Sequence, residues 1–246
     1  MSSAPATTDT PIVQALDGVV GAGDRVVSVA PVALDAPGRA VPLEVRVSAP
    51  ATGENLPVLL FSHGNGWPLD GYAPLTAFWA AQGFVVVQPT HLDSRRNGIG
   101  LDNPVFGQIW TERRDDLQRI LDQFAAVEAA VPGLAGRVDR DQVVVAGHSW
   151  GAQTVQMLLG ARILDASGHP GEDYADRRVR AGILLAATGI GGEELHPFAR
   201  QHFPFIVSSF VDAPAFRRGG IEAPAWAGQG RPVRAPGGSG VVSGGG

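Results

Sequence analysis

The sequence predicts an α/β domain in which a predominantly parallel sheet carries helices on both faces. Short continuous apolar runs, typical of strands buried on both faces, recur along the chain. They cover residues 57–62, 83–88, 142–146 and 181–187. Segments with helical spacing of apolar residues separate these runs, and this alternation is typical of βαβ units. At 246 residues, 44% of them hydrophobic, the chain can form one sizeable core.

The remaining elements follow from local pattern. Residues 25–34 and 40–47 alternate apolar and polar side chains around the turn at 35–38, which predicts an antiparallel hairpin at the N-terminal side of the sheet. A helix is expected to begin near Tyr72. After the charged stretch 112–115, a second helix is predicted from apolar residues at helical spacing, and a third helix is expected over 151–160. The apolar positions of the second helix are Leu117, Leu121, Phe124 and Val127.

Composition divides the chain into three parts. Residues 1–20 are expected to form a flexible N-terminal segment, and residues 21–212 the core, with a lid-like segment at 188–205. Residues 213–246 are rich in Gly and Pro and show neither strand nor helix periodicity, so we expect an irregular tail.

Bulk properties exclude several classes of function. The net charge is −5 and no basic stripe stands out, which argues against a nucleic-acid partner. The absence of Cys excludes disulfides, thiolate metal sites and cysteine nucleophiles. No phosphate-binding or dinucleotide-binding glycine loop is present, and neither a cofactor nor a metal is expected. Without a visible signal peptide or an apolar run of about 18 residues, we expect a cytoplasmic protein of bacterial type with no membrane span.

The most informative motif is Gly147-His148-Ser149-Trp150-Gly151, which lies between a buried strand and an amphipathic helix. In a strand–turn–helix elbow the serine takes a strained conformation that exposes its oxygen, and the following helix points its positive end at the same place. Ser149 is therefore predicted to be a nucleophile, and the N–H of Trp150 to bind an oxyanion. The alternative is an ordinary Gly/Ser turn at the end of a strand.

A second motif, Ser62-His63-Gly64-Asn65-Gly66-Trp67, follows the first buried strand. The two glycines allow the backbone to approach a substrate closely, and the N–H of Asn65 is the natural second oxyanion donor. The alternative is a tight loop that binds no ligand.

The segments "VLLFSHGNGW…AFWAAQGFVVVQPTHLDS" and "RDDLQRILDQF…RVDRDQVVVAGHSWGAQTVQMLLGAR" together resemble the α/β-hydrolase superfamily. More narrowly, they resemble its chlorophyllase-like and dienelactone- or polyester-hydrolase-like serine esterases. The resemblance covers about residues 20–210. It implies a Ser-His-Asp triad that hydrolyses carboxylic esters through an acyl-enzyme on Ser149, with Asn65 and Trp150 forming the oxyanion hole.

The sequence departs from the family order of serine, acid and histidine, because no histidine follows His202. The resemblance therefore implies that the normal C-terminal portion of the family is lacking and that the C-terminal strands of the sheet are incomplete. The candidate substitutes are Asp212 as the acid and His202 or His196 as the base.

The other histidines are expected to be structural or superficial. His63 and His148 adjoin the two motifs, but a side chain next to Ser149 on a strand points away from it, and His63 is expected to support its own loop. His91 follows a strand at the same edge of the sheet and is expected, with Trp67, to line a pocket. His169 lies in a polar loop.

Two hypotheses remain after the sequence alone. The first is a serine hydrolase acting on small-molecule or polymeric esters that are hydrophobic or aromatic, with an activity that the missing acid and base would impair. The second is a catalytically inactive α/β-hydrolase fold that serves binding, or a truncated gene product.

Overall fold

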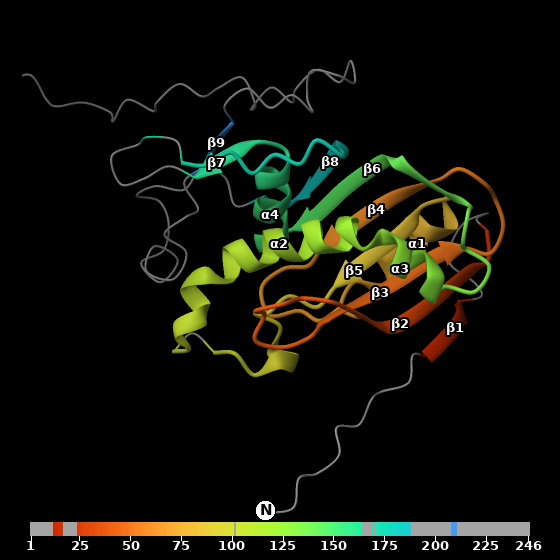
Figure 1. Ribbon diagram of the computed structural model, residues 1–246, viewed down its shortest axis with the longest axis horizontal. Helices are drawn as coiled ribbons and strands as arrows, with labels where there is room; N and C mark the ends of the chain where they lie inside the picture. The colour runs from red at the N-terminus through yellow and green to blue at the C-terminus, as the bar shows by residue number, and fades with distance from the viewer. Residues whose placement is uncertain are drawn as a thin grey trace, which may run out of the picture.

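A computed structural model describes residues 12–16, 24–100, 102–163, 169, 171–187 and 208–210. Its main feature is a seven-stranded sheet with the strand order β1-β2-β3-β5-β4-β6-β8 (Figure 1). The strands are β1 (Ile12–Leu16), β2 (Val26–Leu34), β3 (Leu43–Pro50), β4 (Leu56–Ser62), β5 (Val85–Pro89), β6 (Val138–His148) and β8 (Val179–Leu185).

The sheet is mixed in the way that the sequence predicts. Strands β1, β2, β3 and β5 pair antiparallel in that order, which confirms the expected hairpin. Strands β5, β4, β6 and β8 then pair parallel. Strand β1, formed by residues 12–16 of the N-terminal segment, pairs antiparallel with β2 and was not among the elements expected from the sequence.

The helices cover the two faces of the sheet unequally. They are α1 (Ala73–Ala81), α2 (Ile109–Asp122), α3 (Phe124–Ala130) and α4 (Trp150–Leu158), with two 3₁₀ turns, η1 (Arg95–Asn97) and η2 (Pro104–Gln108). The sequence predicts α2 and α3 as one helix, but the helical geometry is interrupted at Gln123. Gln123 instead forms hydrogen bonds with the backbone N–H and carbonyl of Asp35 in the β2–β3 turn.

Side chains on alternate positions of the central strands enter different cores, as the two-residue repeat of a strand requires. Val58 and Leu60 of β4 pack in a large core with apolar residues of α2, α3 and α4. Leu59 and Phe61 pack in a smaller core beneath α1. Helix α1 therefore covers one face and the other three helices cover the opposite face, which gives the three layers seen in Figure 1.

Strand β8 is less buried than its apolar sequence predicts. It is the last strand of the described sheet, and Ile183 is 37% exposed. A separate two-stranded antiparallel pair joins β7 (Ala161–Ile163) to β9 (Ser208–Phe210). The predicted lid at 188–205 and the predicted tail at 213–246 lie outside the described residues.

Candidate active site

The elbow around Ser149 has the strained geometry expected of a nucleophile. Ser149 follows β6 directly, precedes the first residue of α4 and has φ 53° and ψ −118°. A non-glycine residue with positive φ costs free energy that the surrounding structure must offset, and such residues cluster at functional sites. The Ser149 amide donates a hydrogen bond to the Leu185 carbonyl of β8 at 2.9 Å, which fixes the turn from below.

The two glycines of the motif are required by close packing rather than by a positive φ. A Cβ on Gly147 would lie 2.2 Å from the Gly151 carbonyl oxygen. A Cβ on Gly151 would lie 1.9 Å from the carbonyl oxygen of Ser62, at the end of β4. Side chains at these positions would push α4 away from the sheet, so the glycines allow the helix to begin directly beneath the serine.

The loop of residues 63–67, called the oxyanion loop below, lies at the same edge of the sheet as the elbow. Strands β4 and β6 are parallel neighbours, and Ser62 pairs with Gly147. The oxyanion loop and the elbow, which follow these strands, therefore leave the sheet side by side. Ligands of open α/β sheets bind at this edge, beyond the carboxyl ends of the strands.

Two backbone amides of the oxyanion loop donate hydrogen bonds to side chains of the protein, and the amide between them does not. The Gly64 N–H donates to the hydroxyl of Tyr72 at 3.2 Å, and the Gly66 N–H donates to Oδ2 of Asp93 at 2.9 Å. Asn65 between them is exposed, and no partner for its amide lies within the described residues. This amide is therefore available to an anion outside the loop.

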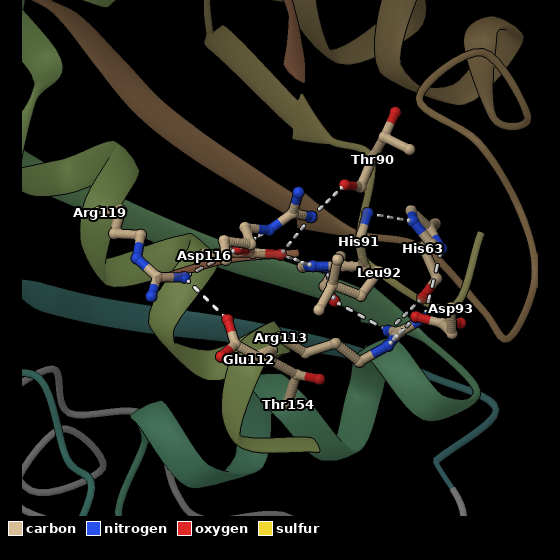
Figure 2. Close-up of polar contacts among 12 residues, drawn as sticks. His63, Thr90, His91, Leu92, Asp93, Glu112, Arg113, Asp116, Arg119 and Thr154 are labelled. Atoms are coloured by element: carbon tan, nitrogen blue, oxygen red, sulfur yellow. Dashed lines mark hydrogen bonds and ion pairs between the residues drawn. The ribbon is translucent and has the colours of Figure 1, made fainter. Parts of the chain in front are cut away.

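A buried ion pair holds the oxyanion loop from behind (Figure 2). Arg113 of α2 is fully buried and donates two hydrogen bonds to the Asp93 carboxylate, each of 2.8 Å. Its guanidinium also donates to the backbone carbonyls of His63 at 2.8 Å and Gly64 at 3.3 Å. Burial alone would raise the pKa of Asp93, but the charge and hydrogen bonds of Arg113 outweigh it and hold that pKa well below its ordinary value.

A chain of hydrogen bonds next to this ion pair has the connectivity of a catalytic triad. Ser62 Oγ lies 2.9 Å from His91 Nε2, and His91 Nδ1 lies 2.9 Å from Asp116 Oδ2. All three side chains are fully buried, so no substrate reaches the Ser62 hydroxyl. Arg39 completes the cluster with an ion pair of 2.9 Å to Asp116. We interpret the chain as structural.

The protonation of this cluster follows from its burial. Burial, reinforced by Arg113, lowers the pKa of His91 well below its ordinary value. Burial raises the pKa of Asp116 to about 6, against the opposing effect of Arg39. His91 is therefore neutral near pH 7.

The tautomer of His63 is set by its neighbours. Its Nε2 accepts the backbone N–H of His91 at 3.0 Å, so its Nδ1 carries the proton and donates to the Gly64 carbonyl at 2.7 Å. Burial, followed by the charge of Arg113, lowers the pKa of His63. This confirms the prediction that His63 supports its own loop.

The structure corrects one predicted pocket residue and places another. His91 is fully buried in the hydrogen-bonded cluster, so the prediction that it lines a pocket is wrong. Trp67 is 47% exposed at the end of the oxyanion loop, where a substrate could contact it. The ring of Trp150 is 3% exposed and packs against Phe106 and the Arg113 guanidinium, so this side chain belongs to the core beneath the site.

The acid and base of a triad are not found among the described residues. No hydrogen bond joins the Ser149 hydroxyl to any of the described histidines, which are His63, His91, His148 and His169. The candidates His196, His202 and Asp212 lie outside the described residues. Within the described part of the chain, no cluster of three or more His, Asp or Glu could hold a metal ion. No helix there is long and apolar enough to span a membrane.

Sequence reasoning missed Tyr72, Arg113 and Asp116, which connect the parts of the site. The available signal was positional. Arg113 lies four residues after the buried Ile109 of α2, and Asp116 lies four residues before the buried Ile120. A charge in the apolar stripe of a helix indicates a buried partner.

Known proteins with related sequences are hydrolases by name. Platelet-activating factor acetylhydrolase of Cavia porcellus is 25% identical over 197 residues, which is 66% of this chain and 42% of that protein. The enzyme of the same name from Bos taurus is 25% identical over 202 residues, which is 67% of this chain and 42% of that protein. The chain thus spans about two fifths of the length of these curated relatives.

Similar solved structures include two esterases. The hyperthermophilic esterase from Pyrobaculum calidifontis has 24% sequence identity and a TM-score of 0.36, covering 53% of this chain and 36% of that one. A thermophilic esterase from Thermogutta terrifontis has 18% identity and a TM-score of 0.45, covering 71% of this chain and 62% of that one.

The family assignment comes from a family model. The model described as the alpha/beta hydrolase family matches residues 59–241, a range that contains the oxyanion loop, the buried ion pair and the elbow. The strand order and the helices on both faces of the sheet agree with that match. The chain therefore belongs to the alpha/beta hydrolase family.

Proposed function

We propose that this protein is a serine hydrolase that cleaves carboxylic esters through an acyl-enzyme on Ser149. The observation that carries the proposal is the strained φ of Ser149 at the start of α4, opposite a loop whose Asn65 amide has no partner within the described residues. The names of the curated relatives, which are acetylhydrolases, support an ester substrate.

The geometry suits acyl transfer. The Ser149 hydroxyl adds to the ester carbonyl carbon, and the resulting oxyanion accepts hydrogen bonds from the N–H groups of Asn65 and Trp150. Because Trp150 is the first residue of α4, the positive end of the helix dipole adds to this stabilisation. Loss of the alcohol leaves an acyl-enzyme, which a water molecule then hydrolyses to restore the serine.

Proton transfer needs a base and an acid from the part of the chain that is not described. We propose His202 or His196 as the base, which takes the proton of Ser149 and returns it to the leaving alcohol. Asp212 is the proposed acid that orients this histidine.

The proposed substrates are esters with a hydrophobic or aromatic group. Trp67 is 47% exposed at the end of the oxyanion loop, and its ring packs against that of Tyr72 with centroids 5.6 Å apart. An exposed aromatic side chain in this position offers apolar contact area to an acyl or alcohol group.

The direct test compares wild type with Ser149→Ala in the hydrolysis of a short-chain p-nitrophenyl ester. We expect kcat/KM to fall by at least about 10³-fold, because the nucleophile is lost while binding remains. The matched control is Thr52→Ala, which removes an exposed hydroxyl in the bend before β4 and should hydrolyse the ester at the wild-type rate. Equal rates of hydrolysis by wild type and Ser149→Ala, or no hydrolysis by either protein, would refute the proposal.

The base is tested by His202→Gln and His196→Gln in the same assay. The variant that loses the base is expected to lose activity by a factor comparable with that of Ser149→Ala, because serine and base act as a unit. Full activity in both variants would show that neither histidine is the base.

A further inference from the structure

We propose that Tyr72 is a positioning residue that fixes the spacing between the oxyanion loop and the nucleophile elbow, residues 147–151. Its effect on catalysis rests on the proposed function, whereas the physical bridge between the two segments does not. Tyr72 is the residue immediately before α1, and its side chain is partly buried between the two segments.

The Tyr72 hydroxyl contacts both segments at once. It accepts the backbone N–H of Gly64 at 3.2 Å and lies 2.8 Å from Nδ1 of His148. A tyrosine hydroxyl both donates and accepts hydrogen bonds, so it can hold the Gly64 amide and the His148 ring at the same time. Gly64 precedes Asn65 and His148 precedes Ser149, so the bridge ends one residue away from an oxyanion donor and one residue away from the nucleophile.

The ring of Tyr72 is held in place by aromatic neighbours. It packs edge-on against Phe61 of β4 with centroids 4.8 Å apart and lies 5.6 Å from both Trp67 and His148. Edge-to-face contacts at such distances are favourable. The hydroxyl therefore occupies a defined place even when one of its hydrogen bonds is removed.

The space beside the Tyr72 hydroxyl leaves little room for a side chain at position 64. A Cβ on Gly64 would lie 3.0 Å from the Tyr72 hydroxyl and 3.1 Å from His148 Nδ1. The glycine in the oxyanion loop thus lets the loop backbone approach the bridge closely. The bridge and the glycine together set how far the Asn65 amide lies from the elbow.

A second bridge connects the same segments through Arg113. Its guanidinium donates to the His63 and Gly64 carbonyls and lies 4.7 Å from the centroid of the Trp150 ring, a cation–π contact. Because Arg113 remains when the Tyr72 hydroxyl is removed, we expect the two segments to loosen rather than to separate.

The spacing matters because an oxyanion must contact both donors together. Donors act when they lie about 2.7–3.1 Å from the developing charge, and a displacement of about 1 Å can lower a rate by about 100-fold. A bridge that fixes the Asn65 amide relative to the Trp150 amide therefore affects the transition state, where the charge develops, more than it affects ester binding.

The experiment uses the two tyrosines of the chain. Tyr72→Phe removes the bridging hydroxyl and keeps the ring. Tyr174→Phe is the matched control, because Tyr174 packs instead against Trp110 and Arg114 of α2. With a p-nitrophenyl ester, we expect Tyr72→Phe to lower kcat roughly 10-fold with KM unchanged, which is less than the cost of about 100-fold for a displacement of about 1 Å, because Arg113 still holds the loop. Tyr174→Phe should match wild type.

A second readout does not depend on activity. Amide hydrogen exchange measured residue by residue should become faster at Gly64, whose N–H loses its acceptor in Tyr72→Phe, and remain at the wild-type rate in Tyr174→Phe. If wild type proves inactive, the proposed function fails, and the exchange data still decide whether the bridge exists.

The route through His148 is tested by a double-mutant cycle with His148→Phe. If Tyr72 acts through His148, the double variant should lose no more kcat than the worse single variant. Wild-type exchange and wild-type kcat in Tyr72→Phe would overturn the proposal. So would a raised KM with unchanged kcat, because that result would indicate a substrate contact instead.

Discussion

The substitution Asp93→Asn is expected to destabilise the fold strongly although it changes one atom of the side chain. The Asp93 carboxylate is 4% exposed and accepts two hydrogen bonds from Arg113 and one from the Gly66 amide. An asparagine of the same shape has no charge, and its NH₂ group would face donors where an oxygen now accepts. The fully buried Arg113 cation would then lack its counter-ion.

The magnitude follows from the burial of both partners. Removing one member of a buried ion pair typically costs about 3–5 kcal/mol, because the remaining charge stays desolvated without compensation. The free energy of unfolding of a typical domain is about 5–15 kcal/mol. Asp93→Asn should therefore remove a large fraction of the free energy of unfolding.

The assay is urea unfolding at pH 7.5 followed by circular dichroism, with Asp70→Asn as the matched control. Asp70 forms an ion pair with Arg46 near the surface, and the side chain of Asp70 is 52% exposed. Such a pair contributes about 0–1 kcal/mol. A loss below about 1 kcal/mol for Asp93→Asn, similar to that for Asp70→Asn, would refute the assignment of Asp93 and Arg113 as a stabilising buried pair.

Two further predictions concern the elbow and the pH dependence of stability. Gly151→Ala should prevent α4 from packing on β4, because the new Cβ would lie 1.9 Å from a β4 carbonyl oxygen. Gly107→Ala, where no atom lies within 4 Å of the added Cβ, should unfold at the wild-type temperature. Burial keeps His63 and His91 neutral in the folded protein by lowering their pKa values, whereas both are protonated in the unfolded chain below about pH 6.5. The free energy of unfolding measured with urea should therefore be constant above about pH 6.5 and decrease below it. Each histidine contributes a slope of up to about 1.4 kcal/mol per pH unit. The carboxyl of Asp116, with its pKa raised by burial to about 6, opposes one of these slopes between about pH 6 and 4.

Each of these predictions has a contradicting result. Equal thermal midpoints for Gly151→Ala and Gly107→Ala would contradict the close approach of α4 to β4. A free energy of unfolding that is constant between pH 7.5 and pH 5 would contradict the burial of the two neutral histidines.

The architecture was predictable because its signals are local. Each central strand is a continuous apolar run, and the residues on its two faces enter separate cores, as Leu59 and Leu60 do. The elbow was predictable for the same reason, since strand, serine and helix are consecutive in sequence. The glycines flanking Ser149 belong to the motif found in the sequence, and the structure shows that close packing requires them.

The connections within the site were not predictable in this way. The local sequence around Arg113 is a charged stretch typical of a solvent-facing helix surface. Its burial depends on Asp93, which lies twenty residues earlier. His91 occupies the correct edge of the sheet for a pocket residue, but Ser62 and Asp116 enclose it from two other elements. Such clusters depend on several distant partners being present together, which the periodicity of one segment does not reveal.

The central claim, that Ser149 is an activated nucleophile, is tested most directly by labelling with a fluorophosphonate followed by peptide mass mapping. The reagent forms a covalent bond with an activated serine and requires no knowledge of the natural ester. We expect a single adduct on Ser149 that is absent from Ser149→Ala and retained in Thr52→Ala. No adduct on the wild-type protein, or an adduct on Ser62 within the buried hydrogen-bonded cluster, would contradict it.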